Sequence, residues 1–314
     1  MSRALFRRVL AALLAVMAPA QAAPEPGSPE ACALAGRGAL AVTFSGNQPL
    51  VQVTIDGQSA TLLLDTGAER TLLGAATVQR LRLPADPARS TTIRGIGGAA
   101  TSRNAIARRL RIGAADLADQ SLAVAPYALR GLGPGVDGLL GGDLLANFDV
   151  DLNLGAAEVL LYRARNCVGA APAWRDPPAL TADIGRGPGR NLLYLPIVLD
   201  GRTLSALIDT GADTGADLGA IDRAAAAAIG TTGEVLREAG RFTVHGAAPV
   251  DATARRHRFT AASIGLDNIS RPALLVVDLP PGSADVLIGI GFARSHRIWV
   301  SYASRRMFIG YAGR

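Results

Sequence analysis

The fold of this chain is decided by the stretch Val53-Thr-Ile-Asp-Gly-Gln-Ser-Ala-Thr-Leu-Leu-Leu-Asp-Thr-Gly-Ala68. A matching stretch, Ile197-Val-Leu-Asp-Gly-Arg-Thr-Leu-Ser-Ala-Leu-Ile-Asp-Thr-Gly-Ala212, follows in the second half. In each copy, Asp-Gly predicts a two-residue hairpin turn between two strands. The second strand of each hairpin is apolar and runs directly into Asp-Thr-Gly-Ala.

A second motif repeats in the same way. Asp137-Gly-Leu-Leu-Gly141 matches Asp285-Val-Leu-Ile-Gly289, and the offsets between the copies are 209 − 65 = 144 and 289 − 141 = 148 residues. Two landmarks at nearly one offset indicate an internal duplication. We therefore predict a mostly β chain made of two similar halves. Short helices are expected only over 144–148 and 223–229.

The repeated Asp-Thr-Gly can carry chemistry. Asp65 and Asp209 each leave the end of a buried strand, where a carboxylate is costly unless it is hydrogen-bonded or paired. If the lobes pack about a two-fold axis, the two carboxyl groups meet there and share a proton. One then takes a proton from a water molecule while the other donates a proton to a carbonyl oxygen. This arrangement hydrolyses an amide without a metal or a covalent nucleophile. A plain turn role for the aspartates is the alternative.

These residues resemble a known family. Asp65-Thr-Gly-Ala68, Asp209-Thr-Gly-Ala212, Leu139-Leu-Gly141 and Leu287-Ile-Gly289 look like the motifs of retropepsin-like and pepsin-like aspartic proteases, of the bacterial exported type with both lobes in one chain. The resemblance covers roughly residues 38–312. It implies a mostly β fold of two pseudo-symmetric, acid-protease-like β-barrel lobes with a cleft between them. It also implies an aspartic-type endopeptidase that binds a peptide or protein substrate in extended conformation.

The resemblance also implies roles for neighbouring residues. Thr66 and Thr210 would form an interlobe hydrogen-bond grip, and Gly67 and Gly211 would support the catalytic loops. Each lobe would carry a flap over the substrate. The flap and substrate-binding positions would be Gly95, Ile96, Gly97 and Gly98 in the first lobe and His245 and Gly246 in the second. For His245, a solvated loop histidine is the alternative.

The second half departs from the pattern. Asp209-Thr-Gly-Ala is followed by a tandem copy, Asp213-Thr-Gly-Ala, which lacks an apolar strand before it, so we assign the catalytic role to Asp209. This degeneracy motivates a rival function, a non-catalytic peptide-binding protein that retains the fold. The basic run Arg255-Arg-His-Arg258 is interpreted as a solvated hairpin edge, with contact to an acidic substrate as the alternative.

Composition excludes several classes of protein. Hydrophobic residues make up 49% and charged residues 18%, which excludes wholesale disorder. The three His and two Cys residues have no zinc-like spacing, so neither a metal nor a cofactor is expected. The net charge of +6 falls to +3 without the three N-terminal Arg residues, which gives little support for nucleic-acid binding. We expect a monomer, because both half-sites lie in one chain; a homodimer is the alternative.

The N-terminus resembles an export signal. Arg3, Arg7 and Arg8 precede an apolar run over 9–18 that is too short to span a bilayer, and Ala20-Gln-Ala22 is a small-x-small cleavage pattern. We predict an exported, periplasmic or secreted protein with no stable membrane insertion after signal removal; a retained anchor is the alternative. In that compartment Cys32 and Cys167 could pair, and two separate thiols are the alternative.

The predicted organisation is therefore as follows. Residues 1–22 are a signal peptide and 23–37 a mature N-terminal segment. Residues 38–165 form the first aspartic-protease-like lobe and 191–314 the second. The Pro- and Gly-rich stretch 166–190 is the linker between them.

Overall fold

The computed structural model describes residues 37–95, 98–126, 129, 132–162, 172, 174, 178, 180–185, 189–215, 217–230, 234–244, 250–279 and 282–312. The first half contains β1 (Arg37–Ser45), β2 (Gln48–Ile55), β3 (Gln58–Leu64), β4 (Leu72–Leu73), α2 (Ala75–Leu81), β5 (Ala85–Gly95), β6 (Gly98–Ile112), β7 (Ala115–Val124), β8 (Gly138–Leu140), α3 (Gly142–Leu145), β9 (Asp149–Asn153), η1 (Leu154–Ala156) and β10 (Glu158–Tyr162).

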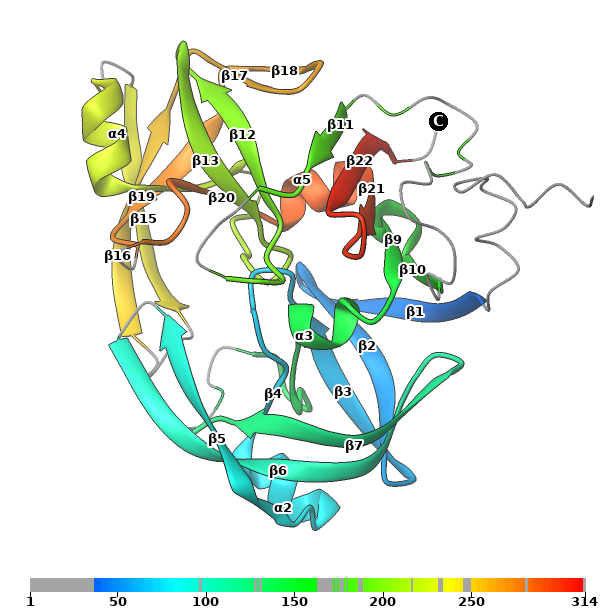
Figure 1. The fold of residues 1–314 in the computed structure, drawn as a ribbon. Helices are drawn as coiled ribbons and strands as arrows, with labels where there is room; N and C mark the ends of the chain where they lie inside the picture. Colours follow the sequence, from blue (N-terminus) through cyan, green and yellow to red (C-terminus); the bar gives the residue numbers. More distant parts are fainter. Residues whose placement is uncertain are drawn as a thin grey trace, which may run out of the picture.

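The second half follows a similar order. It contains β11 (Leu180–Asp183), β12 (Tyr194–Leu199), β13 (Arg202–Ile208), β14 (Gly219–Asp222), α4 (Arg223–Ile229), β15 (Glu234–Val244), β16 (Val250–Arg258), β17 (Ala261–Ile264), β18 (Asp267–Ser270), β19 (Ala273–Val277), β20 (Val286–Ile288), α5 (Ile290–Ser295), β21 (His296–Ser301) and β22 (Arg306–Tyr311). It has an additional hairpin, β17–β18, between β16 and β19. The structure is thus mostly β and has two lobes, as predicted; in Figure 1 the first lobe lies below the second.

The repeated Asp-Gly pairs form the predicted hairpin turns. Asp56 and Gly57 have φ of 48° and 82°, and Asp200 and Gly201 have φ of 46° and 81°. Two successive positive φ angles define the type I′ turn, whose twist matches that of the flanking strands. These turns fix the register of β2 with β3 and of β12 with β13.

The second repeated motif lies beside the first. The strand β8 pairs parallel with β3, with Leu140 beside Leu64, and β20 pairs parallel with β13, with Ile288 beside Ile208. Each parallel pair brings the ends of two strands together at the point where Asp-Thr-Gly begins. The motif also continues into a short helix in each lobe, α3 and α5.

The lobes share one six-stranded layer, in the order β11-β22-β21-β9-β10-β1. In its centre β9 pairs with β21, and Asp151 lies opposite Trp299. These residues are 299 − 151 = 148 positions apart, which is the offset of the second motif. A residue paired with its own repeat lies on the symmetry axis, so the pseudo-two-fold axis passes between Asp151 and Trp299.

Two sequence expectations need correction. The segment expected to be the linker contains a strand, β11, because Leu180–Asp183 pairs antiparallel with β22. Two helices were also missed, α2 and α5; neither has a side-chain cap, so the sequence gives no start signal for them. The helices expected over 144–148 and 223–229 are present as α3, which begins earlier, and α4.

The sheets that lead to Asp-Thr-Gly have two apolar faces. Leu62, Leu64 and Ile208 point into a core that continues through both lobes. The alternate residues Leu63 and Leu207 point the other way, into smaller clusters of their own. Because side chains alternate along a strand, Asp65 and Asp209 continue the face of Leu63 and Leu207.

Candidate active site

Two threonines join the lobes beneath the Asp-Thr-Gly turns. The Thr66 hydroxyl donates to the Ile208 carbonyl (2.8 Å) and accepts from the Thr210 N–H (3.1 Å). The Thr210 hydroxyl donates to the Leu64 carbonyl (2.6 Å) and accepts from the Thr66 N–H (3.0 Å). Both threonines are 1% exposed. Four symmetric, buried hydrogen bonds therefore fix the two turns relative to each other.

The two aspartates face each other across this connection. Oδ1 of Asp65 accepts the N–H groups of Gly67 and Ala68, both at 3.0 Å. Oδ1 of Asp209 accepts those of Gly211 (2.9 Å) and Ala212 (3.1 Å). These equivalent bonds orient both carboxyl groups in the same way.

Glycine is required at the third position of each motif. A Cβ added to Gly211 would lie 2.6 Å from Cγ of Asp65, and one added to Gly67 would overlap the carboxyl group of Asp209. The backbone of each turn therefore lies against the carboxyl group of the opposite lobe. This close approach explains the spacing of Asp and Gly in both copies.

The surroundings raise the pKa of both acids. Burial raises the pKa of Asp65 well above its usual value, and the charge of Asp209 raises it further. Burial also raises the pKa of Asp209, while N–H donors and a hydrogen bond with Asp65 lower it in part. Two carboxyl groups in such contact titrate as a pair and retain one proton over a wide pH range.

Two further aspartates support the strands that lead to this pair. Oδ2 of Asp137 accepts the Thr61 N–H (2.9 Å), and Oδ2 of Asp285 accepts the Ser205 N–H (2.8 Å). Both aspartates begin the second repeated motif. The sequence analysis identified the motif but did not predict that its first residue, an aspartate in both copies, binds the neighbouring strand.

The tandem Asp-Thr-Gly in the second lobe is an inserted segment, separate from Asp65 and Asp209. In the register, Leu72 lies opposite Leu139 and Ala220 opposite Leu287, an offset of 220 − 72 = 148. The four residues that change the offset from 144 to 148 therefore lie between Asp209 and Ala220. Asp213 is exposed and accepts a hydrogen bond from Asn47 of the first lobe (2.9 Å).

The expected flap positions lie on or beside two hairpins. Gly95 and Gly98 pair with each other at the end of the β5–β6 hairpin, while Ile96 and Gly97 lie outside the described residues. The β15–β16 hairpin brackets His245 and Gly246, which also lie outside them. Both hairpins extend on the same side of the molecule in Figure 1.

The basic run is not a simple solvated edge. Arg255 is exposed, but His257 is 4% exposed and packs edge-on against Phe259, and burial lowers its pKa. Arg256 makes a bidentate ion pair with buried Asp217. Because side chains alternate along β16, Arg255 and His257 lie on one face of the strand and Arg256 and Arg258 on the other.

Several expectations concern residues that the structure leaves undescribed. The signal segment, residues 23–36 of the mature N-terminal segment 23–37, Cys32 and Cys167 lie outside the described residues. Among the residues that are described, no helix combines the length and apolar character needed to cross a membrane. In the same part of the chain, no three acidic, His or Cys side chains gather as metal ligands would.

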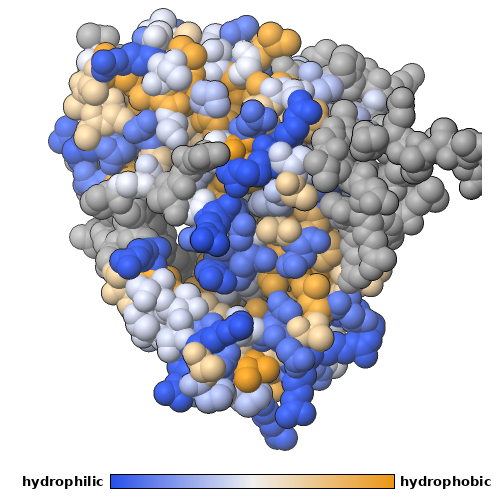
Figure 2. Space-filling view, in the orientation of Figure 1, coloured by the Kyte–Doolittle hydropathy of each residue, from blue (hydrophilic) through white to orange (hydrophobic). Residues whose placement is uncertain are grey.

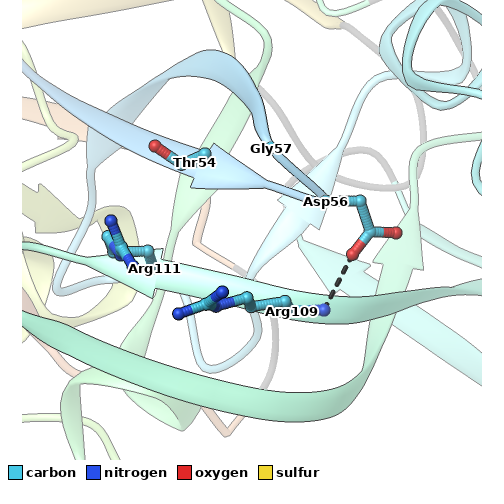
Figure 3. A pocket seen from close by; sticks show the side chains of 5 residues that line it. All are labelled: Thr54, Asp56, Gly57, Arg109 and Arg111. Atoms are coloured by element: carbon cyan, nitrogen blue, oxygen red, sulfur yellow. Dashed lines mark hydrogen bonds between the residues drawn. The ribbon is translucent and has the colours of Figure 1, made fainter.

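A hollow elsewhere on the first lobe is separate from the aspartates. It has a volume of about 340 Å³ and is lined by Thr54, Asp56, Gly57, Arg109 and Arg111 (Figure 3). Asp56 accepts the Arg109 N–H there, and both arginines bind Asp116. The hollow lies at the opposite end of β3 from Asp65. The seven residues of this strand span about 20 Å. We therefore assign it no part in the site.

The surface over the boundary between the lobes is largely polar on the face shown in Figure 2. Hydrophilic residues follow the middle of that face, where the lobes of Figure 1 meet. Apolar residues gather on either side of them.

Comparisons with known proteins agree with this geometry. Residues 51–144 match the model of a family described as aspartyl protease. No curated protein matches the sequence. The fold is similar to the crystal structure of an aspartic proteinase from Irpex lacteus, with a TM-score of 0.56 and 14% sequence identity over 88% of this chain and 98% of that one.

Proposed function

We propose that this chain, which has the fold of the aspartic proteinases and matches the aspartyl protease family over residues 51–144, is an aspartic endopeptidase with Asp65 and Asp209 as its catalytic pair. The observation that carries the proposal is the direct contact of these two carboxyl groups, one from each half, with raised pKa values in both. A non-catalytic peptide-binding protein has no need of such a costly pair.

The mechanism follows from one proton shared by two acids. The ionised carboxylate takes a proton from a water molecule as the water oxygen bonds to the peptide carbonyl carbon, and the protonated partner gives its proton to the carbonyl oxygen. The C–N bond of the tetrahedral intermediate then breaks while the nitrogen takes a proton from one acid of the pair, and a hydroxyl group of the intermediate returns a proton to the other acid as the C=O bond forms again. The products are a carboxyl and an amine terminus. Activity falls once the pH is high enough to ionise both acids.

The remaining parts of the proposal concern the setting. The substrate is an extended peptide held between the lobes, with the two hairpins β5–β6 and β15–β16 closing over it. We also propose that the protein acts as a monomer after export to the periplasm or outside the cell, with a Cys32–Cys167 disulfide. Mass spectrometry of secreted protein, before and after reduction, tests the cleavage site and the disulfide.

The test of catalysis is substitution of each acid. Asp65→Asn and Asp209→Asn should each lower kcat for a mixed peptide library by about a thousandfold, since positioned acid–base groups contribute about 10²–10⁴. Asp213→Asn is the matched control, because it changes the tandem Asp-Thr-Gly and keeps an acceptor for Asn47. Full turnover by either pair variant, with a native circular dichroism spectrum, would reject the proposal.

A further inference from the structure

The ion pair of Arg256 and Asp217 places a charged group beside an apolar cluster of the second lobe. Nε and Nη2 of Arg256 both bond the Asp217 carboxylate, and Nε lies 2.7 Å from Oδ1. The Asp217 side chain is 6% exposed, whereas that of Arg256 is 39% exposed. Among the described residues, the remaining nitrogen, Nη1, has no hydrogen-bond partner.

The register shows which way Arg256 points. It lies opposite Leu275 of β19, and Leu275 lies beside Ala220 of β14. Leu275 and Ala220 belong to an apolar cluster that also includes Leu287. Leu287 in turn packs with Leu207, whose face Asp209 continues two residues later. Arg256 therefore lies on the side of the second lobe that carries Asp209.

The first lobe has no counterpart of this charge. The corresponding position on β6 is Asn104, next to Ala105, which pairs with Leu122. The Asn104 amide donates to Ser121 (3.0 Å) and does not reach the loop after Asp65. The two lobes therefore differ at equivalent positions: Asn104 in the first lobe corresponds to Arg256 in the second.

We propose that Arg256 is a specificity determinant that binds a carboxylate of the substrate, so that the protein prefers peptides with Asp or Glu at the position nearest to it. This inference rests on the proposed function, because a preference in hydrolysis requires that the protein cleaves peptides. A guanidinium has five N–H donors in a fixed plane, and Asp217 occupies one edge of it. The free edge is held in place by that bond, so that little side-chain entropy is lost when a second carboxylate binds.

Neighbouring charges do not explain the same preference. Arg255 is exposed but alternates to the opposite face, where it lies opposite Val276 of the continuous core. Asp213, the other acid near the insertion, accepts hydrogen bonds from the Asn47 side chain and from the Gly215 N–H. Arg258 shares the face of Arg256 and lies opposite Ala273, and what distinguishes Arg256 from it is the bidentate bond to Asp217.

The experiment compares peptides that differ in one residue, Glu against Gln, at each position in turn at pH 6. At one position the Glu peptide should have a kcat/KM about fivefold to tenfold higher, the effect of one charge-assisted hydrogen bond at a partly exposed site. Arg256→Lys should weaken this ratio. The double variant Arg256→Gln/Asp217→Asn, which leaves no unpaired buried charge, should reduce the ratio to about one. Arg255→Gln is the matched control and should keep it.

A binding measurement separates this inference from the proposed function. Asp65→Asn protein is titrated with the same fluorescent Glu and Gln peptides, and tighter binding of the Glu peptide should appear without turnover. If no protein variant hydrolyses peptides but Glu peptides still bind more tightly through Arg256, the endopeptidase proposal fails and the specificity stands. Equal Glu and Gln values in hydrolysis and in binding would overturn the role of Arg256.

Discussion

At the scale of single residues, the site depends on two glycines as much as on two acids. Gly67 and Gly211 lie against the carboxyl groups of the opposite lobe, so each turn forms part of the wall around its partner's acid. The N–H of each glycine also bonds its own aspartate. Asp-Thr-Gly is therefore a reciprocal unit: each copy supplies an acid and makes room for the other.

This reciprocity predicts the effect of adding one methyl group. Gly67→Ala should lower kcat by at least about a hundredfold, because the new Cβ would displace the Asp209 carboxyl group from its partner, and small misplacements of reacting groups have effects of this size. Gly74→Ala is the matched control, since its Cβ would meet neighbours at 3.4–3.5 Å, an ordinary contact. Steady-state kinetics with Tm measurements check both; unchanged kcat in Gly67→Ala would contradict the geometry.

At the scale of elements, the strands that end in Asp-Thr-Gly are held from two sides. The parallel neighbours β8 and β20 hold them laterally, through Asp65 N–H to the Leu140 carbonyl (3.0 Å) and Asp209 N–H to the Ile288 carbonyl (2.9 Å). The threonine hydroxyls connect the ends of β3 and β13 across the lobes. The position of each acid thus depends on elements from both halves.

The threonine connection gives a prediction at this scale. Thr66→Ala would leave the Ile208 carbonyl and the Thr210 N–H without their bonds in a buried site. We expect a loss of about 3 kcal/mol in the free energy of unfolding, since each unsatisfied buried group costs about 1–3 kcal/mol. Thr66→Ser keeps the hydroxyl and should lose less than half as much. Denaturant unfolding measures both, and equal losses would show that the methyl group, rather than the hydroxyl, carries the effect.

At the scale of the whole molecule, the six-stranded layer makes one body of two lobes. Its central pair, β9 and β21, contains buried Asp149 opposite Ser301. Burial raises the pKa of Asp149 to about 6, and the neighbouring Ser301 side chain lowers it in part. An acid whose pKa is raised on folding is protonated in the folded state and ionised in the unfolded state between the two values. Stability therefore falls as the pH rises through this window.

Asp149→Asn should remove that pH dependence. A change in pKa from 3.8 to about 6 corresponds to about 3 kcal/mol, so the variant should gain up to about this much over the natural protein between pH 4 and pH 7. The comparison is the difference in unfolding free energy between variant and natural protein at each pH, in which the contributions of Asp65 and Asp209 cancel. A difference that stays constant with pH would show that Asp149 keeps its usual pKa in the folded protein.

The duplication, the hairpin turns and the candidate pair of Asp65 and Asp209 could all be identified from the sequence, because they depend on local spacing that recurs in both halves. The change of offset by four residues also indicated extra residues in the second half, and the strand register placed them between Asp209 and Ala220. Three features became visible only in the folded chain: β11 joins the layer shared by the lobes, His257 is buried, and Arg256 binds Asp217. These features depend on which strands become neighbours and which face each side chain takes, and neither is encoded within a single short segment.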